Sequence, residues 1–172
     1  MAFVSLISEM PDSFSIEADG DGAHVVLVPV AYCDVTDRLV QVESRLTYTQ
    51  ATLPRLNIAS FHEFSFTILV VSLSDDAPTY ETQDRTYARL YLPDGCRPLI
   101  MPIVSACLKA LVAHVRPTVI YRVTKSRNPP EKALRKDVLL TRTLEDEGYA
   151  VIETGTDLWG RRFWVLSRAL TV

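Results

Sequence analysis

The chain has 172 residues, of which 48% are hydrophobic and 23% are charged, and its formal net charge is -3. A chain of this length and composition can bury roughly two thirds of its surface around one core, so we expect a single domain spanning residues 1–172. The same composition argues against extensive disorder.

The N-terminal segment does not have the pattern of a secretory signal. No basic residue precedes its apolar stretch, and Glu9 and Pro11 interrupt that stretch early. The longest apolar run, residues 98–115, contains Pro102 and Lys109. It is therefore better explained as a buried helix than as the span of about 20 apolar residues that a bilayer requires. We expect a cytoplasmic protein with no membrane contact.

The cysteines predict neither a disulfide framework nor a zinc site. Cys33, Cys96 and Cys107 are three in number, and no two of them have the CxxC spacing. We therefore expect reduced thiols and no bound metal.

Positive charge is concentrated in residues 116–142. That segment has eight Lys and Arg residues against Glu131 and Asp137, and Arg122 and Arg127 are among the eight. Such a density of charge can bind the phosphates of a nucleotide or of nucleic acid. A solvated helix face is the simpler interpretation, because the segment lacks the interleaved aromatics on which bases stack. Nucleic acid therefore remains a less favoured partner.

The first clear element is a strand over residues 23–32, rich in β-branched side chains and preceded by an Asp-Gly-Asp-Gly turn. With residues 14–17 it is expected to form a hairpin. A short helix is expected between residue 34 or 36 and residue 46.

The segment 61–73 alternates apolar and polar residues and then becomes wholly apolar, which predicts a strand that enters the centre of a sheet. His62 and Glu63 are adjacent on this strand. Because adjacent strand residues lie on opposite faces, the two cannot readily act as a pair. Glu63 alone stays a candidate general base.

A second alternating segment, residues 84–92, follows a loop and is expected to form another strand. Its polar face would consist of Tyr87, Arg89 and Tyr91, as a solvated stripe or as the floor of a binding site. A helix is predicted over residues 102–115, apolar nearly all round.

The last third of the chain has the clearest pattern. A central strand is expected at residues 118–123, then a helix at residues 130–147 that Gly148 ends, then strands at residues 149–153 and 162–166. The apolar stripe of that helix is expected to be Leu134, Val138, Thr141 and Leu144. The loop between the last two strands contains Trp159 and is longer than a hairpin requires, which favours a role beyond connection.

These elements predict an α/β (α+β) protein with a single-layer, mixed and mostly antiparallel sheet of about six to seven strands, with helices packed on it. The element order over residues 61–168, and the sequence LEDEGYAVIETG at residues 144–155, resemble the GNAT acyltransferase superfamily. The resemblance implies an acetyl-CoA site between two splayed central strands. It also implies that the pyrophosphate rests on the N-terminus of the core helix, near Arg97 and Ile103.

The chain departs from the GNAT pattern at the residues that hold the cofactor. Phosphates approach backbone N–H groups closely where glycine leaves them unobstructed, yet no glycine lies between Gly95 and Gly148. Pro98 and Pro102 remove two further amides from the helix start. In addition, Leu144 stands where many members of the superfamily have the tyrosine that protonates the leaving thiolate.

Three functional hypotheses remain open. We favour a noncatalytic binding or regulatory domain without a cofactor, which contacts a protein or small molecule through Tyr87, Arg89, Tyr91 and the Trp159 loop. The first alternative is an atypical acetyl-CoA-dependent N-acyltransferase. It would use Glu63 as base, Tyr149 or Tyr121 as acid, and Arg97 and Ile103 at the pyrophosphate.

The second alternative is a nucleic-acid-associated protein that uses the basic segment, including Arg122 and Arg127. A homodimer is compatible with apolar strands near both ends of the sheet, but no feature of the sequence requires one.

Overall fold

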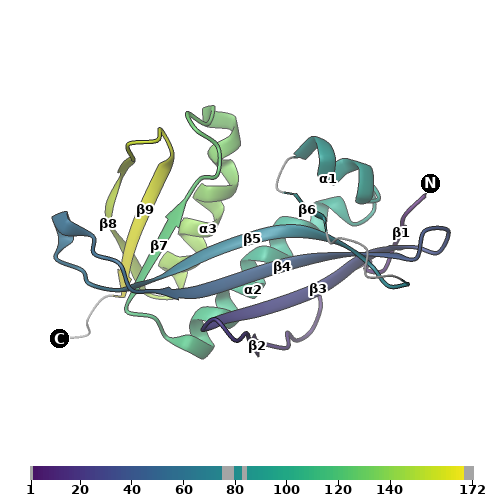
Figure 1. The fold of residues 1–172 in the computed structure, drawn as a ribbon, viewed down its shortest axis with the longest axis horizontal. Coiled ribbons are helices and arrows are strands. Elements are labelled where there is room, and N and C mark those ends of the chain that lie inside the picture. The colour runs from purple at the N-terminus through teal and green to yellow at the C-terminus, as the bar shows by residue number, and fades with distance from the viewer. Residues whose placement is uncertain (1, 75–79, 83–84, 169–172) are drawn as a thin grey trace. The chain divides into compact units, whose positions relative to one another are not determined.

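The computed structural model describes residues 2–74, 80–82 and 85–168 (Figure 1). In chain order the strands are β1 (Val4–Ser5), β2 (Glu17–Ala18), β3 (Ala23–Cys33), β4 (Arg38–Thr49), β5 (Phe61–Ser72), β6 (Tyr80–Thr82), β7 (Val119–Val123), β8 (Tyr149–Thr156) and β9 (Arg162–Arg168). The helices are α1 (Arg85–Tyr91), α2 (Ile100–Val115) and α3 (Arg135–Asp146), with 3-10 turns η1 (Pro54–Leu56), η2 (Arg97–Leu99) and η3 (Glu131–Leu134).

The described strands form one mixed sheet in the order β1-β3-β4-β5-β7-β9-β8, with β2 paired to β3 and β6 paired to β5. Strands β5 and β7 are parallel, whereas β9 is antiparallel to both β7 and β8. The expected α/β class with a mixed sheet is therefore confirmed, and the architecture is compatible with a GNAT-like fold.

The chain groups into two compact units. Unit 1 comprises Met1–Glu17, Val25–Ser44 and Phe66–Cys107, and unit 2 comprises Ala18–His24, Arg45–Ser65 and Leu108–Val172. Buried side chains in unit 1 include Val25, Val26, Val28, Val30, Val40, Val42, Ile68, Val70, Ile103 and Val104. Those in unit 2 include Leu46, Phe61, Phe64, Leu108, Leu111, Ile120, Leu140, Leu144, Val165 and Leu166.

Helix α2 is the apolar run that the sequence assigns to a buried helix. By length and composition alone, the helical run Arg97–Val115 could cross a membrane, but core helices of soluble proteins pass the same test. One face of α2 is fully buried within the protein, including the side chains of Ile103, Cys107, Leu108 and Leu111. This burial accounts for the apolar composition of the inward face of α2, whereas a third of the apolar run as a whole is buried.

Most predicted elements are confirmed. The strands expected at residues 23–32, 61–73, 118–123, 149–153 and 162–166 correspond to β3, β5, β7, β8 and β9. The helix expected from residue 102 starts at Ile100, and the helix expected from residue 130 begins as η3 and continues as α3. Gly148 ends it with φ 86°, a left-handed conformation that glycine adopts without steric cost.

Two predicted elements are wrong. The helix expected within residues 34–46 is strand β4, in which Val40, Val42 and Leu46 are buried at the two-residue period of a strand. The strand expected at residues 84–92 is helix α1 over its described part, Arg85–Tyr91. In so short a segment, alternation fits either structure, and the Arg, Ala and Leu residues of α1 favour a helix.

A buried ion pair fixes strand β7 against helix α3 in unit 2. Nη2 of Arg122 lies 2.7 Å from Oδ1 of Asp137, and Nη1 donates to the Asp137 carbonyl oxygen at 3.1 Å. Arg122 is only 4% exposed, and its guanidinium lies 5.7 Å from the centre of the Trp164 ring. The pair decides which face of α3 is buried: Asp137, Leu140, Thr143 and Leu144 lie inside, whereas Val138 of the predicted stripe is 47% exposed.

We expect Asp137→Asn to lower the free energy of unfolding by about 3–5 kcal/mol, because it leaves the Arg122 charge buried without its counter-ion. Urea unfolding followed by circular dichroism measures the change. Asp146→Asn, on the exposed surface of the same helix, is the matched control and should change the stability by less than about 0.5 kcal/mol. Equal stabilities of the two variants would contradict a structural role for the pair.

Candidate functional site

The side of the β5-β7-β9 sheet opposite the Arg122 pair presents a cluster of aromatic and titratable side chains. Arg122 points toward α3, so its neighbour Tyr121 points to the other face. Glu63 is the register partner of Tyr121 on β5 and lies on the same face. The Tyr121 ring centre lies 5.2 Å from that of Phe61 and 6.1 Å from that of Phe163. We call Phe61, Glu63, Tyr121 and Phe163 the Tyr121 face.

The two titratable groups of the Tyr121 face have altered acidities. Burial raises the pKa of Glu63, and the positive charge of Arg161 opposes part of that increase. Burial also raises the pKa of Tyr121, and Arg161 again acts in the opposite direction, while Asp157 and Glu63 add to the increase. A carboxyl with a raised pKa beside a phenol can donate or accept a proton closer to neutral pH than an exposed carboxyl can.

The turn between β8 and β9 is fixed by the carboxylate of Asp157. That carboxylate accepts hydrogen bonds from the backbone N–H of Trp159 at 2.9 Å, and from the backbone N–H and Nε of Arg161, both at 2.8 Å. Gly160 has φ 78°, which a residue with a Cβ adopts only with strain. Burial of Asp157 would raise its pKa, but its hydrogen bonds from Arg161 and Trp159 outweigh that effect and hold the pKa below its usual value.

This rigid turn holds two large apolar side chains in water. Leu158 is 98% exposed and Trp159 is 58% exposed. The guanidinium of Arg161 lies 5.1 Å from the centre of the Trp159 ring, which orients the indole. We call Leu158 and Trp159 the apolar tip.

The loop that follows β7 lies beside the apolar tip. The backbone N–H of Asn128 donates to the carbonyl oxygen of Gly160 at 2.7 Å, and the backbone N–H of Thr124 donates to the carbonyl oxygen of Arg162 at 2.8 Å. Lys125 and Arg127, which we call the basic loop, are both exposed between these two anchors. The structure thus brings Arg127 and Trp159, both candidate binding residues, into one region of unit 2.

The structure separates Glu63 from Tyr149. Tyr149 pairs in register with Arg168, three residues after the Val165 that pairs with Tyr121. Because strand residues alternate, Tyr149 lies on the opposite face of the sheet from Glu63. Its hydroxyl donates to the carbonyl oxygen of Pro117 at 2.7 Å, and burial raises its pKa. The structure therefore does not bring Glu63 and Tyr149 together, and Tyr121 is the phenol beside Glu63.

Arg122 must also be removed from the predicted binding surface. It is buried against α3 and engaged by Asp137, so no partner can reach its guanidinium. Sequence alone gave no indication of this, because a charged residue in a basic segment is usually solvated.

In unit 1, the residues expected at a pyrophosphate are committed elsewhere. Nε of Arg97 donates to the carbonyl oxygen of Leu92 at 2.7 Å, Nη2 donates to that of Arg89 at 2.8 Å, and Nη1 contacts Asp94. Ile103 is fully buried in the first turn of α2, six residues after the helical run begins at Arg97 as η2.

The stripe expected from Tyr87, Arg89 and Tyr91 does not form, because residues two apart on helix α1 lie on different faces. The Tyr91 ring packs edge-on against Phe3, with 5.7 Å between ring centres, and Arg89 is exposed. The side chain of Tyr87 lies outside the described part of the structure.

Comparison with known proteins adds no relative: no family model, curated protein or solved structure matches the chain. Over residues 2–74, 80–82 and 85–168, no group of three His, Cys, Asp or Glu side chains has the arrangement of a metal site.

Sequence reasoning missed Leu158, Asp157 and Arg161. The Asp-x-x-Gly spacing at Asp157 and Gly160 is a turn signal that could have indicated them.

We expect the free energy of unfolding of Glu63→Gln, relative to that of the wild type, to increase with pH. Because the folded pKa of Glu63 is raised, its contribution to stability is fully present below the unfolded value of 4.5 and is lost as pH rises through the folded pKa. Glutamine has no such dependence, so the variant should gain on the wild type between pH ~4 and pH ~8 in urea unfolding. Glu131→Gln, at an exposed site, controls for the change in net charge. A difference that shrinks with rising pH would contradict the burial of Glu63.

Proposed function

We propose that the chain is a soluble, cytoplasmic, GNAT-like domain that acts as a noncatalytic binding module, and that it contacts a partner protein through the apolar tip. Support for the GNAT-like topology comes from the parallel strands β5 and β7, which pair at only two positions, His62 with Ile120 and Glu63 with Tyr121. Such a short pairing fits the two splayed central strands that the resemblance implies.

The exposure of Leu158 and Trp159 on a fixed turn is the observation that supports binding most directly. Exposed apolar side chains on a mobile loop would lose conformational freedom on binding, whereas a turn held by the Asp157 carboxylate has already lost it. Tryptophan is also among the residues that contribute most to protein interfaces. The apolar tip therefore has the composition and the rigidity of an interface hot spot.

The surroundings of the tip indicate the chemistry of the partner. Lys125 and Arg127 are exposed beside Trp159, on a loop anchored by Asn128 and Thr124. Basic side chains along one side of an apolar centre are complementary to an apolar pocket with acidic side chains at its edge. We therefore propose a protein partner with such a pocket. The nucleic-acid alternative is weakened, because Arg122 is withdrawn into the core.

The proposal of a domain without a cofactor is supported by unit 1. The guanidinium of Arg97 is engaged by Leu92, Arg89 and Asp94, and the prolines at positions 98 and 102 leave fewer amides for a phosphate. Binding of acetyl-CoA would require Arg97 to exchange these contacts for the pyrophosphate.

We expect a photo-crosslinking amino acid in place of Leu158 to capture one partner protein in cells. The same amino acid in place of Leu139, which is exposed on α3, should not capture it. Trp159→Ala should weaken the interaction of the purified pair by roughly 30-fold, because truncating a hot spot costs about 2 kcal/mol or more.

Trp159→Ala should leave the unfolding midpoint nearly unchanged, since the side chain is largely in water. Equal capture from positions 158 and 139, or an affinity that Trp159→Ala leaves intact, would contradict the proposal. A crosslink to nucleic acid would favour the nucleic-acid alternative, and a crosslink to a second copy of the chain would indicate a homodimer through the tip.

A second candidate, acyl transfer, is favoured by the half-buried Glu63 beside Tyr121, which is an arrangement suited to general base catalysis. Acetyl-CoA at 100 times its dissociation constant would add about 2.7 kcal/mol and raise the thermal midpoint by roughly 5–10 °C. We expect no such shift.

A shift of that size would instead establish a cofactor site and make acyl transfer the leading function. Glu63→Gln would then retain the shift but lower the transfer rate by about 10²–10⁴-fold, as expected on loss of a general base. A rate that Glu63→Gln leaves unchanged would exclude Glu63 as the base.

A further inference from the structure

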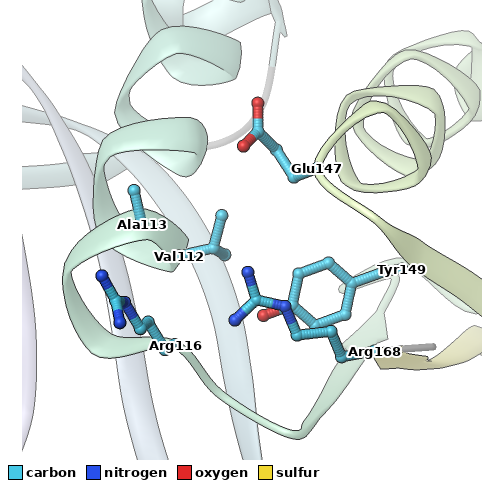
Figure 2. A pocket seen from close by; sticks show the side chains of 6 residues that line it. All are labelled: Val112, Ala113, Arg116, Glu147, Tyr149 and Arg168. Atoms are coloured by element: carbon cyan, nitrogen blue, oxygen red, sulfur yellow. The ribbon is translucent and has the colours of Figure 1, made fainter. Parts of the chain in front are cut away.

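A cavity of ≈ 210 Å³ lies in unit 2, on the face of the sheet opposite the Tyr121 face. Its walls are the last turn of α2, the end of α3 and the paired strands β8 and β9. The lining side chains are Val112, Ala113, Arg116, Glu147, Tyr149 and Arg168 (Figure 2). Because one water molecule occupies about 30 Å³ of liquid, the cavity has room for a small organic molecule.

Positive charge predominates in this cavity. Within the described residues, neither Arg116 nor Arg168 has a carboxylate at ion-pair distance, and the Arg168 guanidinium stacks 5.8 Å from the centre of the Tyr149 ring. Figure 2 shows the Arg168 guanidinium pointing from β9 toward Val112 of α2. The one carboxylate, Glu147, points away from Arg168 and lies 3.9 Å from Lys109.

The remaining walls are apolar or already hydrogen-bonded. Val112 and the ring of Tyr149 present carbon atoms, and the Tyr149 hydroxyl donates its proton to the carbonyl oxygen of Pro117 at 2.7 Å. A ligand therefore finds guanidinium donors at one end and an apolar surface beside them. Guanidinium groups bind carboxylates through two parallel hydrogen bonds.

We propose that this cavity binds a small carboxylate, with its anionic group on Arg168 and Arg116 and its apolar part against Val112 and the Tyr149 ring. A singly charged carboxylate is favoured over phosphate for two reasons. The carbonyl end of α2 brings the negative pole of the helix dipole to Arg116, and Glu147 adds a negative charge at the rim. Both disfavour a dianion. This site is independent of the apolar tip.

Titration of the full chain with benzoate, followed by ¹H–¹⁵N NMR, tests the proposal. We expect saturable shifts at Ala113, Arg116 and Tyr149, and weaker binding of inorganic phosphate. Benzyl alcohol, which keeps the ring but lacks the charge, should bind at least ~10-fold more weakly. Arg168→Gln should weaken benzoate binding by ~10-fold or more, whereas Arg142→Gln, at an exposed position of α3 outside the cavity lining, should leave it unchanged.

Ala113→Leu tests the contribution of the cavity volume separately from that of the two charges, because the larger side chain fills the cavity while both arginines remain. It should abolish benzoate binding, and it keeps the test valid if Arg168→Gln impairs folding. No saturable shift up to about 10 mM benzoate would overturn the proposal. Equal binding of benzyl alcohol and benzoate would also overturn the proposal. Benzoate binding that neither Arg168→Gln nor Ala113→Leu weakens would overturn it as well. Tighter binding of phosphate than of benzoate would overturn the carboxylate assignment.

Discussion

The buried ion pair between Arg122 and Asp137 fixes the two faces of strand β7. With Arg122 held against α3, alternation places Tyr121 on the opposite face, where it meets Glu63 and Phe163. The same constraint extends to β9, because Arg122 pairs in register with Trp164 and Tyr121 pairs with Val165. One charge pair in the interior thus determines on which face of the sheet the side chains of the neighbouring strands lie.

An ion pair in the interior contributes less to net stability than to the choice of register. Removing two charges from water costs several kcal/mol, and the pairing returns about as much. A slip of β7 by one residue, however, would move Arg122 to the Tyr121 face and leave Asp137 buried alone. All five residues of β7 pair with β9, but β7 pairs with β5 at only two positions, so backbone pairing specifies its register against β5 weakly. We infer that the ion pair supplies the missing specificity.

The sequence predicted those parts of the fold in which local pattern and tertiary burial agree. Strand β9 and the end of α3 at Gly148 are examples, since propensity, periodicity and a left-handed glycine indicate the same structure. The prediction failed where burial depends on a distant partner. Helix α3 turns Asp137 inward and Val138 outward because Arg122 is across from it, and no pattern within α3 contains that information.

The candidate site was predictable to a similar extent and for the same reason. Trp159 and Arg127 lie near each other because Asn128 bonds to Gly160, a contact between residues 32 positions apart that a strand-by-strand analysis does not reveal. Glu63 and Tyr149 were each reasonable as catalytic candidates, yet the face of a residue on β8 depends on its register with β9. Register is set by turns and bulges, and β8 has such an irregularity between Val151 and Glu153.

Strand β9 connects the two surfaces proposed for binding. Its first residues adjoin the turn that presents Leu158 and Trp159. Its last residue, Arg168, lines the cavity, which lies on the face of the sheet opposite the Tyr121 face. A ligand in the cavity and a protein at the tip would therefore not compete for the same side chains. An influence of one on the other can pass along β8 or β9, because both strands join the cavity to the turn, and β9 also pairs with β7, where Arg122 and Asp137 oppose a change of register. Thermodynamic linkage requires such an influence to be equal in both directions. Because β9 is held firmly in register, we expect ligand binding in the cavity and protein binding at the apolar tip to be independent of each other.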